Sequence, residues 1–290
     1  MTSLHLVPDA SIGIFDSGIG GLSVLRHIRA QLPQEDLLYV ADSGFAPYGG
    51  KPEDVIVTRT LVIADFLLVR GAKALVLACN TATAAAIKAL RALYPALPVV
   101  GVEPGLKPAA ALSKSGVVGV LATARTLSSD KFEQLREQIS KATEVRFALQ
   151  ACVGLADQIE LGELDSPATE EMIRRYVEPL IADGIDTLVL GCTHYPFVQP
   201  LIERCIRQAT DRPVTIVDTG EAVTRQLERL LTQHQLLQTA NRPGALNAFT
   251  TASEEALVAA FATLLKIQAN VTHIDLRHIE QSGAKLPHKA

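Results

Sequence analysis

Short, continuously apolar segments alternate with longer segments of helical periodicity, and this alternation limits the possible folds of the chain more than any other feature. The expected strands lie at residues 11–16, 36–41, 74–78, 99–102, 117–121, 144–148, 187–190 and 215–217. The expected helices lie at residues 22–31, 52–70, 82–93, 128–141, 169–183 and 220–235. Strands without a polar face are typical of parallel sheets that helices cover on both sides. The sequence therefore predicts an α/β fold with doubly wound, mostly parallel sheets.

Two pairs of similar segments indicate duplicated α/β units that face one another. IGIFDSG at 12–18 is similar to VGVLATA at 118–124, and ALVLACNTAT at 74–83 is similar to TLVLGCTHYP at 187–196. We expect the chain to cross to the second unit near Glu103-Pro104-Gly105. We expect it to return after residue 212, because the segment 215–217 resembles neither half. The predicted domains are therefore 1–103 plus 213–290, and 104–212.

The last part of the chain, from residue 236, has a less regular pattern. Thr251-Ala-Ser-Glu254 is typical of a capping box, and it predicts a helix at 255–267. The final segment, QSGAKLPHKA, is polar and is expected to fray.

Composition excludes several classes of protein. Of the 290 residues, 48% are hydrophobic and 20% are charged, which is enough apolar material for a large core. The sequence contains no block of Lys and Arg that would favour nucleic acid as a partner. It also contains no run of about 18 apolar residues that would predict a membrane span. MTSLHLVPDASIG lacks the pattern of a secretory signal, so a cytoplasmic location is expected. The four cysteines form no CxxC pair, and we expect them to be free.

Two of these cysteines end predicted strands in segments that are written almost alike. In VLACNTAT (76–83) and VLGCTHYP (189–196), an apolar run is followed by a cysteine and then by hydroxyl or amide residues. Ligands bind at the carboxyl edge of a parallel sheet. A helix that begins there offers free N–H groups and a positive dipole end, which lower a thiol pKa and can hold a carboxylate. A single cysteine at a strand end is most often inert packing, but the matching positions of Cys79 and Cys192 favour two reactive thiols.

Charged side chains near the two thiols are candidates for assisting groups. His194 follows Cys192 closely, but no second ligand stands at metal-binding spacing, so proton transfer or substrate contact is favoured over zinc. Asp16 ends the first strand in FDSGIGGLSVL, as either a helix N-cap or a catalytic carboxylate. The glycines of this segment allow a ligand to approach the backbone, although neither GxxxxGK[ST] nor GxGxxG is present.

Other candidate positions have weaker signals. Tyr48 and Gly49, in ADSGFAPYGGK, can offer a hydroxyl and an N–H to a ligand, or can simply form a turn. Glu160 ends a predicted helix, where a solvated carboxylate is the simpler interpretation. Cys205 lies in the helical pattern LIERCIRQ and is expected to pack in a core. Cys152 lacks the flanking residues that distinguish the paired cysteines.

These segments together resemble a known family. FDSGIGGLSVL, PYG, ACNTAT, GVEP, LGCTHYP and VDTGEA, in this order and at these distances, are similar to the cofactor-independent aspartate/glutamate racemases, in particular the glutamate racemases. The resemblance extends from about residue 12 to about residue 265 and includes AFTTASEEAL. Before PYG the chain has Asp42-Ser-Gly-Phe-Ala, where many members of the family have a DTA-type stretch.

The resemblance implies two α/β domains related by a pseudo-twofold axis, with the active site in the cleft between them. It implies that Cys79 and Cys192 are the proton donors and acceptors, assisted by Asp16, His194 and Glu160. It implies neither cofactor nor metal. The residues implied in substrate binding are Asp16, Ser17, Tyr48, Gly49, Asn80, Thr81, Thr193 and His194.

The predicted function is interconversion of L- and D-glutamate by two-base proton transfer at Cα. By family implication, it supplies D-glutamate for peptidoglycan, and so for cell-wall biogenesis and cell shape. The alternatives are an aspartate racemase or a related racemase or decarboxylase, a two-lobed amino-acid-binding protein, and a thiol-redox protein. The expected partner is the small-molecule substrate, without nucleic acid or membrane, and a homodimer is compatible with this prediction.

Overall fold

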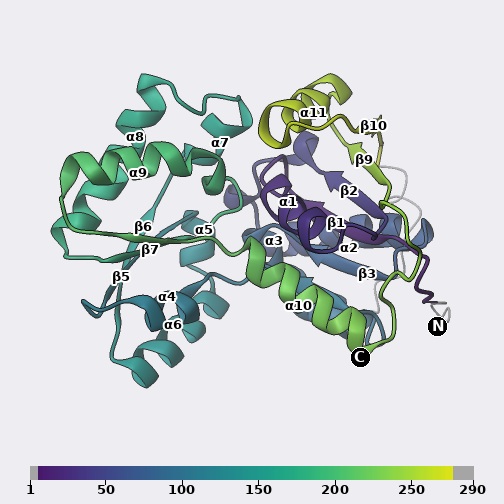
Figure 1. Cartoon of the computed structure of the whole chain (residues 1–290), viewed down its shortest axis with the longest axis horizontal. Coiled ribbons are helices and arrows are strands. Elements are labelled where there is room, and N and C mark those ends of the chain that lie inside the picture. Colours follow the sequence, from purple (N-terminus) through teal and green to yellow (C-terminus); the bar gives the residue numbers. More distant parts are fainter. Residues whose placement is uncertain (1–5, 277–290) are drawn as a thin grey trace.

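Two parallel β-sheets with their helices make up residues 6–276, the part of the chain that this computed structural model describes (Figure 1). The six strands of the first sheet lie in the order β10 (Asn270–His273), β9 (Leu246–Thr250), β2 (Leu37–Ala41), β1 (Ile12–Asp16), β3 (Ala74–Leu77) and β4 (Val99–Gly101). The four strands of the second lie in the order β6 (Arg146–Ala151), β5 (Val117–Ala122), β7 (Thr187–Leu190) and β8 (Thr215–Val217). Every pairing is parallel, which confirms the predicted fold class.

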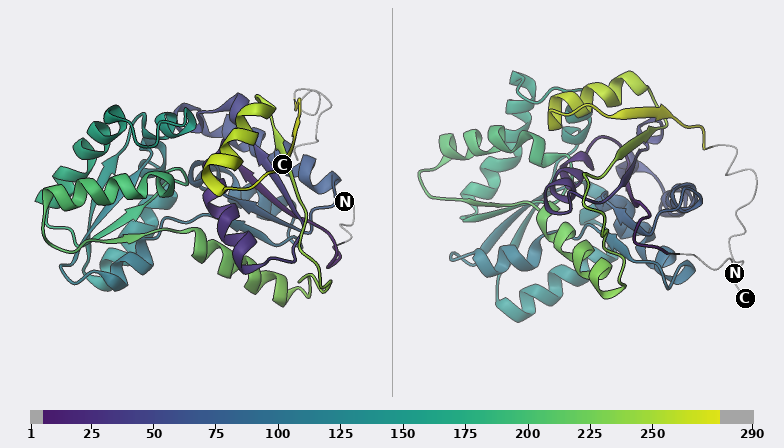
Figure 2. Two further views of the ribbon diagram at one scale, coloured as in Figure 1. Left: turned by 45° about the horizontal axis from the view of Figure 1, so that its top comes forward. Right: turned by 45° about the vertical axis from the view of Figure 1, so that its right-hand side comes forward.

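Helices flank both sheets and form two lobes, which are seen from two further sides in Figure 2. The helices of the first lobe are α1 (Leu22–Gln31), α2 (Glu53–Val69), α3 (Asn80–Leu93), α10 (Gly220–Gln233) and α11 (Glu254–Ala260). Those of the second lobe are α4 (Leu106–Leu112), α5 (Ala124–Leu127), α6 (Asp130–Thr143), α7 (Leu155–Glu160), α8 (Pro167–Ala182) and α9 (Gln199–Ala209). Each strand and helix that was predicted with a residue range between 11 and 235 is present, with ends shifted by at most three residues.

The apolar strands are explained by burial on both faces of each sheet. In β1, Ile12 and Ile14 pack in a core formed with α1 and α10, whereas Phe15 packs on the opposite face with α2 and α3. A strand that is covered on both sides has no position for a polar residue, so the alternation of an exposed strand is absent. No helix of the described residues is long and apolar enough to cross a membrane.

The strand order confirms the duplication. In each lobe the first strand lies between the second and the third, and the fourth lies beyond the third. The order β2-β1-β3-β4 therefore corresponds to β6-β5-β7-β8, and β1 and β5 occupy equivalent central positions.

The predicted return of the chain to the first lobe at residue 213 is wrong. The strand Thr215–Val217 pairs with β7 and completes the second sheet, as β4 completes the first. The chain returns only after Val217, since α10 packs on α1 and β4. The first crossing is near Glu103-Pro104-Gly105 as expected, because the following helix α4 packs on α6 and β7. A strand of three residues carries too little sequence to reveal its equivalence to β4.

The segment after residue 236 adds two strands that were not predicted. β9 extends the first sheet beyond β2, and β10 lies beside β9. The N-cap of α11 is Ser253, whose hydroxyl accepts a hydrogen bond from the Ala256 N–H, so the predicted capping box at Thr251 is wrong. The α-helix ends at Ala260, and a π-helical turn, Phe261–Leu265, follows it directly. The terminal segment QSGAKLPHKA lies outside the described residues.

Candidate active site

A cavity of about 260 Å³ lies between the two lobes, where the carboxyl ends of their strands meet. Both predicted thiols line it, Cys79 from the first lobe and Cys192 from the second. Both are unbonded and almost fully buried, with 5% and 8% of their surface exposed. The residues that line it are Ser17, Ala46, Pro47, Tyr48, Gly49, Gly50, Cys79, Asn80, Thr81, Thr123, Ala124, Cys152, Val153, Gly154, Ala156, Asp157, Glu160, Cys192, Thr193 and His194.

Cys79 is the N-cap of α3, as its position between an apolar strand and a helix predicts. Its sulfur accepts a hydrogen bond from the Ala82 N–H at 3.5 Å and lies 3.4 Å from Ser17 Oγ. Ser17 Oγ in turn donates to Asp16 Oδ1 at 3.4 Å. The Ser17 hydroxyl therefore connects the Cys79 thiol to the buried carboxylate of Asp16.

Cys192 has a different neighbourhood from that of Cys79. Its sulfur lies 3.6 Å from Nδ1 of His194, and Nε2 of His194 lies 2.6 Å from Oε1 of Glu160. The helix expected directly after Cys192 is absent. A 3-10 turn, Tyr195–Val198, follows instead, and α9 begins only at Gln199. An α-helix begun earlier would place the Pro200 ring against a carbonyl of the preceding turn, whereas Pro is tolerated in the first turn.

Asp16 is fully buried at the end of β1 and links the two lobes. It accepts hydrogen bonds from the Gly18 N–H at 2.8 Å and from Thr193 Oγ1 of the second lobe at 3.1 Å. Burial raises the pKa of Asp16 to about 6, and the positive charge of His194 opposes this shift. The N-cap of α1 is Gly21, so the interpretation of Asp16 as a helix cap is wrong.

The electrostatic state of Cys79 differs from the one expected from a helix N-terminus. Burial and the Asp16 carboxylate raise the pKa of the Cys79 thiol to about 12, although the hydrogen bonds with Ser17 and Ala82 oppose this shift. The expectation of a lowered pKa is therefore wrong, because desolvation exceeds the effect of the helix end. At neutral pH Cys79 is a thiol.

His194 has the opposite character. Burial lowers its pKa, but the hydrogen bonds to Cys192 and Glu160 exceed this effect and hold the pKa well above 6.5. The ring lies between the second sulfur and a carboxylate. Its role in proton transfer stays a prediction, whereas the solvated role considered for Glu160 is wrong, since Glu160 bonds to His194 and to the Ile19 N–H at 2.8 Å.

The glycine segment after β1 allows the two lobes to approach one another. A Cβ atom at Gly18 would lie 2.0 Å from Glu160 Oε1, and one at Gly20 would lie 2.4 Å from Nδ1 of His194. Just beyond, Ser23 Oγ donates to the Thr193 carbonyl at 2.8 Å. We expected these glycines to admit a ligand, but what they admit is the side chains of Glu160 and His194 from the opposite lobe.

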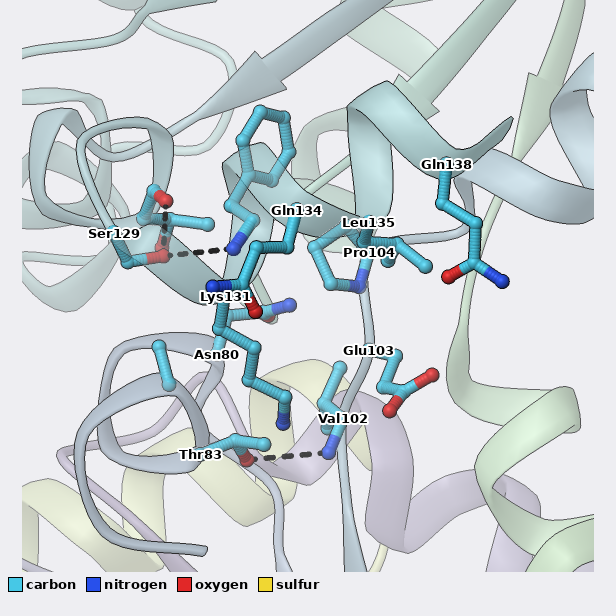
Figure 3. A pocket seen from close by; sticks show the side chains of 13 residues that line it. Asn80, Thr83, Val102, Glu103, Pro104, Ser129, Lys131, Gln134, Leu135 and Gln138 are labelled. Atoms are coloured by element: carbon cyan, nitrogen blue, oxygen red, sulfur yellow. Dashed lines mark hydrogen bonds between the residues drawn. The ribbon is translucent and has the colours of Figure 1, made fainter. Parts of the chain in front are cut away.

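Asn80 lies between the main cavity and a second cavity of about 190 Å³, which is bordered by α3, α6 and the first crossing segment (Figure 3). Asn80 is only 6% exposed, and neither polar atom of its side chain has a hydrogen-bond partner within residues 6–276. Because an unpaired buried amide is costly, Asn80 is suited to bind a polar ligand group. Glu103 and Lys131 line the second cavity, and burial lowers the pKa of Lys131 while Glu103 opposes the shift.

The structure brings the other predicted binding residues to the main cavity, with one change of role. Ser17, Gly49, Thr81 and Thr193 line it. Tyr48 also lines it, but its hydroxyl donates to Asp42 at 2.7 Å and is therefore already engaged.

The sequence analysis did not identify Cys152 and Thr123 as parts of the cavity wall. Cys152 and Thr123 directly follow β6 and β5, so both stand at carboxyl ends of strands. Cys152 was not recognised as a residue at a strand end, because the strand was predicted to end at Ala148 rather than at Ala151. Cys205 is buried in the core of α8 and α9, as predicted. No group of three His, Cys, Asp or Glu side chains in the described part is arranged to hold a metal ion.

Two duplicated α/β lobes that enclose a pair of unbonded thiols define a class of two-domain proteins with a thiol site in the cleft. Residues 12–227 match the model of the Asp/Glu/Hydantoin racemase family. The chain belongs to this family and is an isomerase of the amino-acid racemase class.

Individual relatives agree with this assignment. The glutamate racemase of Ectopseudomonas mendocina is 58% identical over 230 residues, which cover 79% of this chain and 85% of the relative. The glutamate racemase of Methylococcus capsulatus is 57% identical over 234 residues, which cover 80% of this chain and 83% of the relative. Among solved structures, Bacillus anthracis glutamate racemase has a TM-score of 0.83 at 32% identity, covering 93% of this chain and 98% of that one. Francisella tularensis glutamate racemase in complex with D-glutamate has a TM-score of 0.80 at 27% identity, covering 94% and 100%.

Proposed function

We propose that this chain is a glutamate racemase that uses Cys79 and Cys192 as two opposed bases, without a cofactor. The observation that carries the proposal is that free thiols from both lobes, Cys79 of the first and Cys192 of the second, line the same cavity. Racemisation removes the α-proton from one face of Cα and delivers a proton to the other, and a single base reaches both faces of a fixed carbon only with difficulty. Two lobes related by duplication supply a base on each side.

In each turnover one sulfur is a thiolate that accepts the α-proton, and the other is a thiol that donates. The carbanion-like species between them loses its charge when the second thiol protonates Cα on the opposite face. The reverse reaction exchanges the roles of the sulfurs. Afterwards the two sulfurs have exchanged protonation states, and proton exchange with solvent restores them.

Different partners prepare the two sulfurs. Cys79 can pass its proton through Ser17 towards Asp16, which is ionised above a pH of about 6. The ammonium group of an entering amino acid adds positive charge to this buried cavity and favours that transfer. Nδ1 of His194 lies 3.6 Å from the Cys192 sulfur and can exchange a proton with it, and the hydrogen bond with Glu160 orients the ring.

The α-carboxylate must be held where negative charge accumulates. The first N–H groups of α3, at Asn80 and Thr81, have no partner within the helix, and both residues line the cavity. Together with the free amide of Asn80, they are preorganised donors for the charge that develops at Cα and its carboxylate. A closed cleft strengthens this effect because it excludes water.

The biological role follows from the product. We propose that the chain supplies D-glutamate for peptidoglycan, and so for the cell wall and cell shape, that it works in the cytoplasm, and that its partner is the small-molecule substrate. A homodimer is the assembly that we propose, and sedimentation at several concentrations tests it.

Circular dichroism of the purified chain without added cofactor tests the activity. The signal of L-glutamate and that of D-glutamate should both decay to zero, whereas aspartate under the same conditions should keep its signal. Decay with aspartate alone would make the chain an aspartate racemase. Calorimetric binding of glutamate with no decay would identify a binding protein and contradict the proposal.

A further inference from the structure

A buried carboxylate outside the cavity connects three separate parts of the first lobe. Asp42 is fully buried, and each of its oxygens accepts two hydrogen bonds. Oδ1 accepts from Arg59 Nη2 at 2.7 Å and from Thr251 Oγ1 at 2.8 Å. Oδ2 accepts from the Tyr48 hydroxyl at 2.7 Å and from Arg59 Nε at 2.8 Å. Of these four residues, Tyr48 alone lines the cavity.

The hydrogen bond from Tyr48 to Asp42 positions the loop that carries Tyr48 and Gly49 at the cavity. Tyr48 begins the 3-10 turn Tyr48–Gly50, and all three residues of this turn line the cavity. Burial, together with Asp42, raises the pKa of Tyr48 well above 10, so the phenol remains a donor. Its ring packs between Phe15 and Phe45, with centroids 6.0 and 5.9 Å away. The hydroxyl thus anchors the loop and does not serve as a ligand for substrate.

Thr251, which lies 209 positions after Asp42 in the sequence, also forms a hydrogen bond with the Asp42 carboxylate. β9 pairs with β2 so that Thr250 lies opposite Ala41, which places Thr251 beside Asp42. The Thr251 hydroxyl donates to Asp42 and accepts from the Gly44 N–H at 3.0 Å, inside the segment that leads to Tyr48. A Cβ atom at Gly44 would lie 2.3 Å from the Thr251 carbonyl oxygen, so the two segments are in close contact.

We infer that Thr251 is a positioning residue of the active site, which acts through Asp42 on the loop that carries Tyr48 and Gly49. The inference deepens the proposed glutamate racemase function and depends on it for its kinetic readout. A loop that binds substrate equally in the ground state and the transition state affects KM and leaves kcat nearly unchanged.

The test compares Thr251→Val with Thr251→Ser in the full chain. Valine keeps the shape and removes the hydroxyl, and serine restores it. Since the lost bond is made to a charged group, Thr251→Val should raise KM for both enantiomers about tenfold and change kcat less than about threefold. Thr251→Ser should return KM to the wild-type value. Thr232→Val, at an exposed position of α10, is the matched control and should change neither constant.

A second measurement separates this inference from the proposed function. Amide hydrogen exchange of peptides within residues 43–51 should be at least about threefold faster in Thr251→Val than in wild type, whether or not glutamate is the substrate. If wild type fails to racemise glutamate while this exchange still rises, the proposed function fails and the positioning role stands. Unchanged exchange in 43–51, a wild-type KM in Thr251→Val, or a serine variant that fails to restore KM would overturn the inference.

Discussion

Replacement of Cys79 or Cys192 by alanine should lower kcat for racemisation by at least about 10³-fold in both directions, which is within the range of general acid–base contributions. Each variant keeps the other sulfur of this pair, which can still remove the α-proton from one face. In deuterated solvent, each variant should therefore exchange the α-hydrogen of one enantiomer only, and the two variants should exchange opposite enantiomers. Nuclear magnetic resonance of recovered glutamate measures this.

Cys205→Ala is the control for this pair, because Cys205 is buried between α8 and α9 and does not line the cavity. It should keep wild-type turnover, although the lost packing lowers its stability. Near wild-type racemisation by Cys79→Ala or Cys192→Ala would contradict the two-base mechanism, as would exchange of the same enantiomer in both.

Asp16→Asn should lower kcat/KM for racemisation about 10²-fold at pH 8 and also change its pH dependence. In wild type the pKa of Asp16 is raised to about 6, so the carboxyl is ionised above this pH and neutral below it. The relay from Cys79 through Ser17 needs the ionised form. Wild-type kcat/KM should therefore fall tenfold for each pH unit below about 6.

In Asp16→Asn this fall of kcat/KM below about pH 6, the acidic limb of the profile, should be absent because the amide does not titrate. The profile of kcat/KM for each variant between pH 5 and pH 9 provides the measurement, with thermal unfolding to show that the variant is folded. The same acidic limb in Asp16→Asn would assign the titration to another group and remove Asp16 from the relay.

Much of this fold was predictable because its strands are buried on both faces. Continuous apolar runs located β1 to β8 within three residues, and their two similar pairs of segments predicted the duplication. The C-terminal strands were missed for the opposite reason. β9 (LNAFT) and β10 (NVTH) are short and partly polar, so neither periodicity nor apolar length distinguishes them from loops.

The main members of the site were predictable because strand ends carry them. Asp16 is the last residue of a strand, and Cys79 and Cys192 each follow a strand closely. Parallel strands bring such residues together at one edge of the sheet. The pKa of Cys79 was predicted in the wrong direction, since sequence shows the helix end but not the depth of burial. The contacts of Thr251 with Asp42 and of Ser23 with Thr193 join residues 209 and 170 positions apart, and no local pattern encodes them.

Deuterium incorporation during the first turnovers of the wild-type chain tests the two-base claim most directly. L-glutamate is incubated in deuterated solvent, and the isotope at Cα is measured separately in recovered substrate and in D-glutamate product at a few per cent conversion. Because the thiol that protonates the product carries a solvent-derived deuteron, nearly every D-glutamate molecule should contain deuterium while remaining L-glutamate keeps its hydrogen. D-glutamate that retains the original hydrogen, or deuterium appearing equally in both pools, would contradict the account.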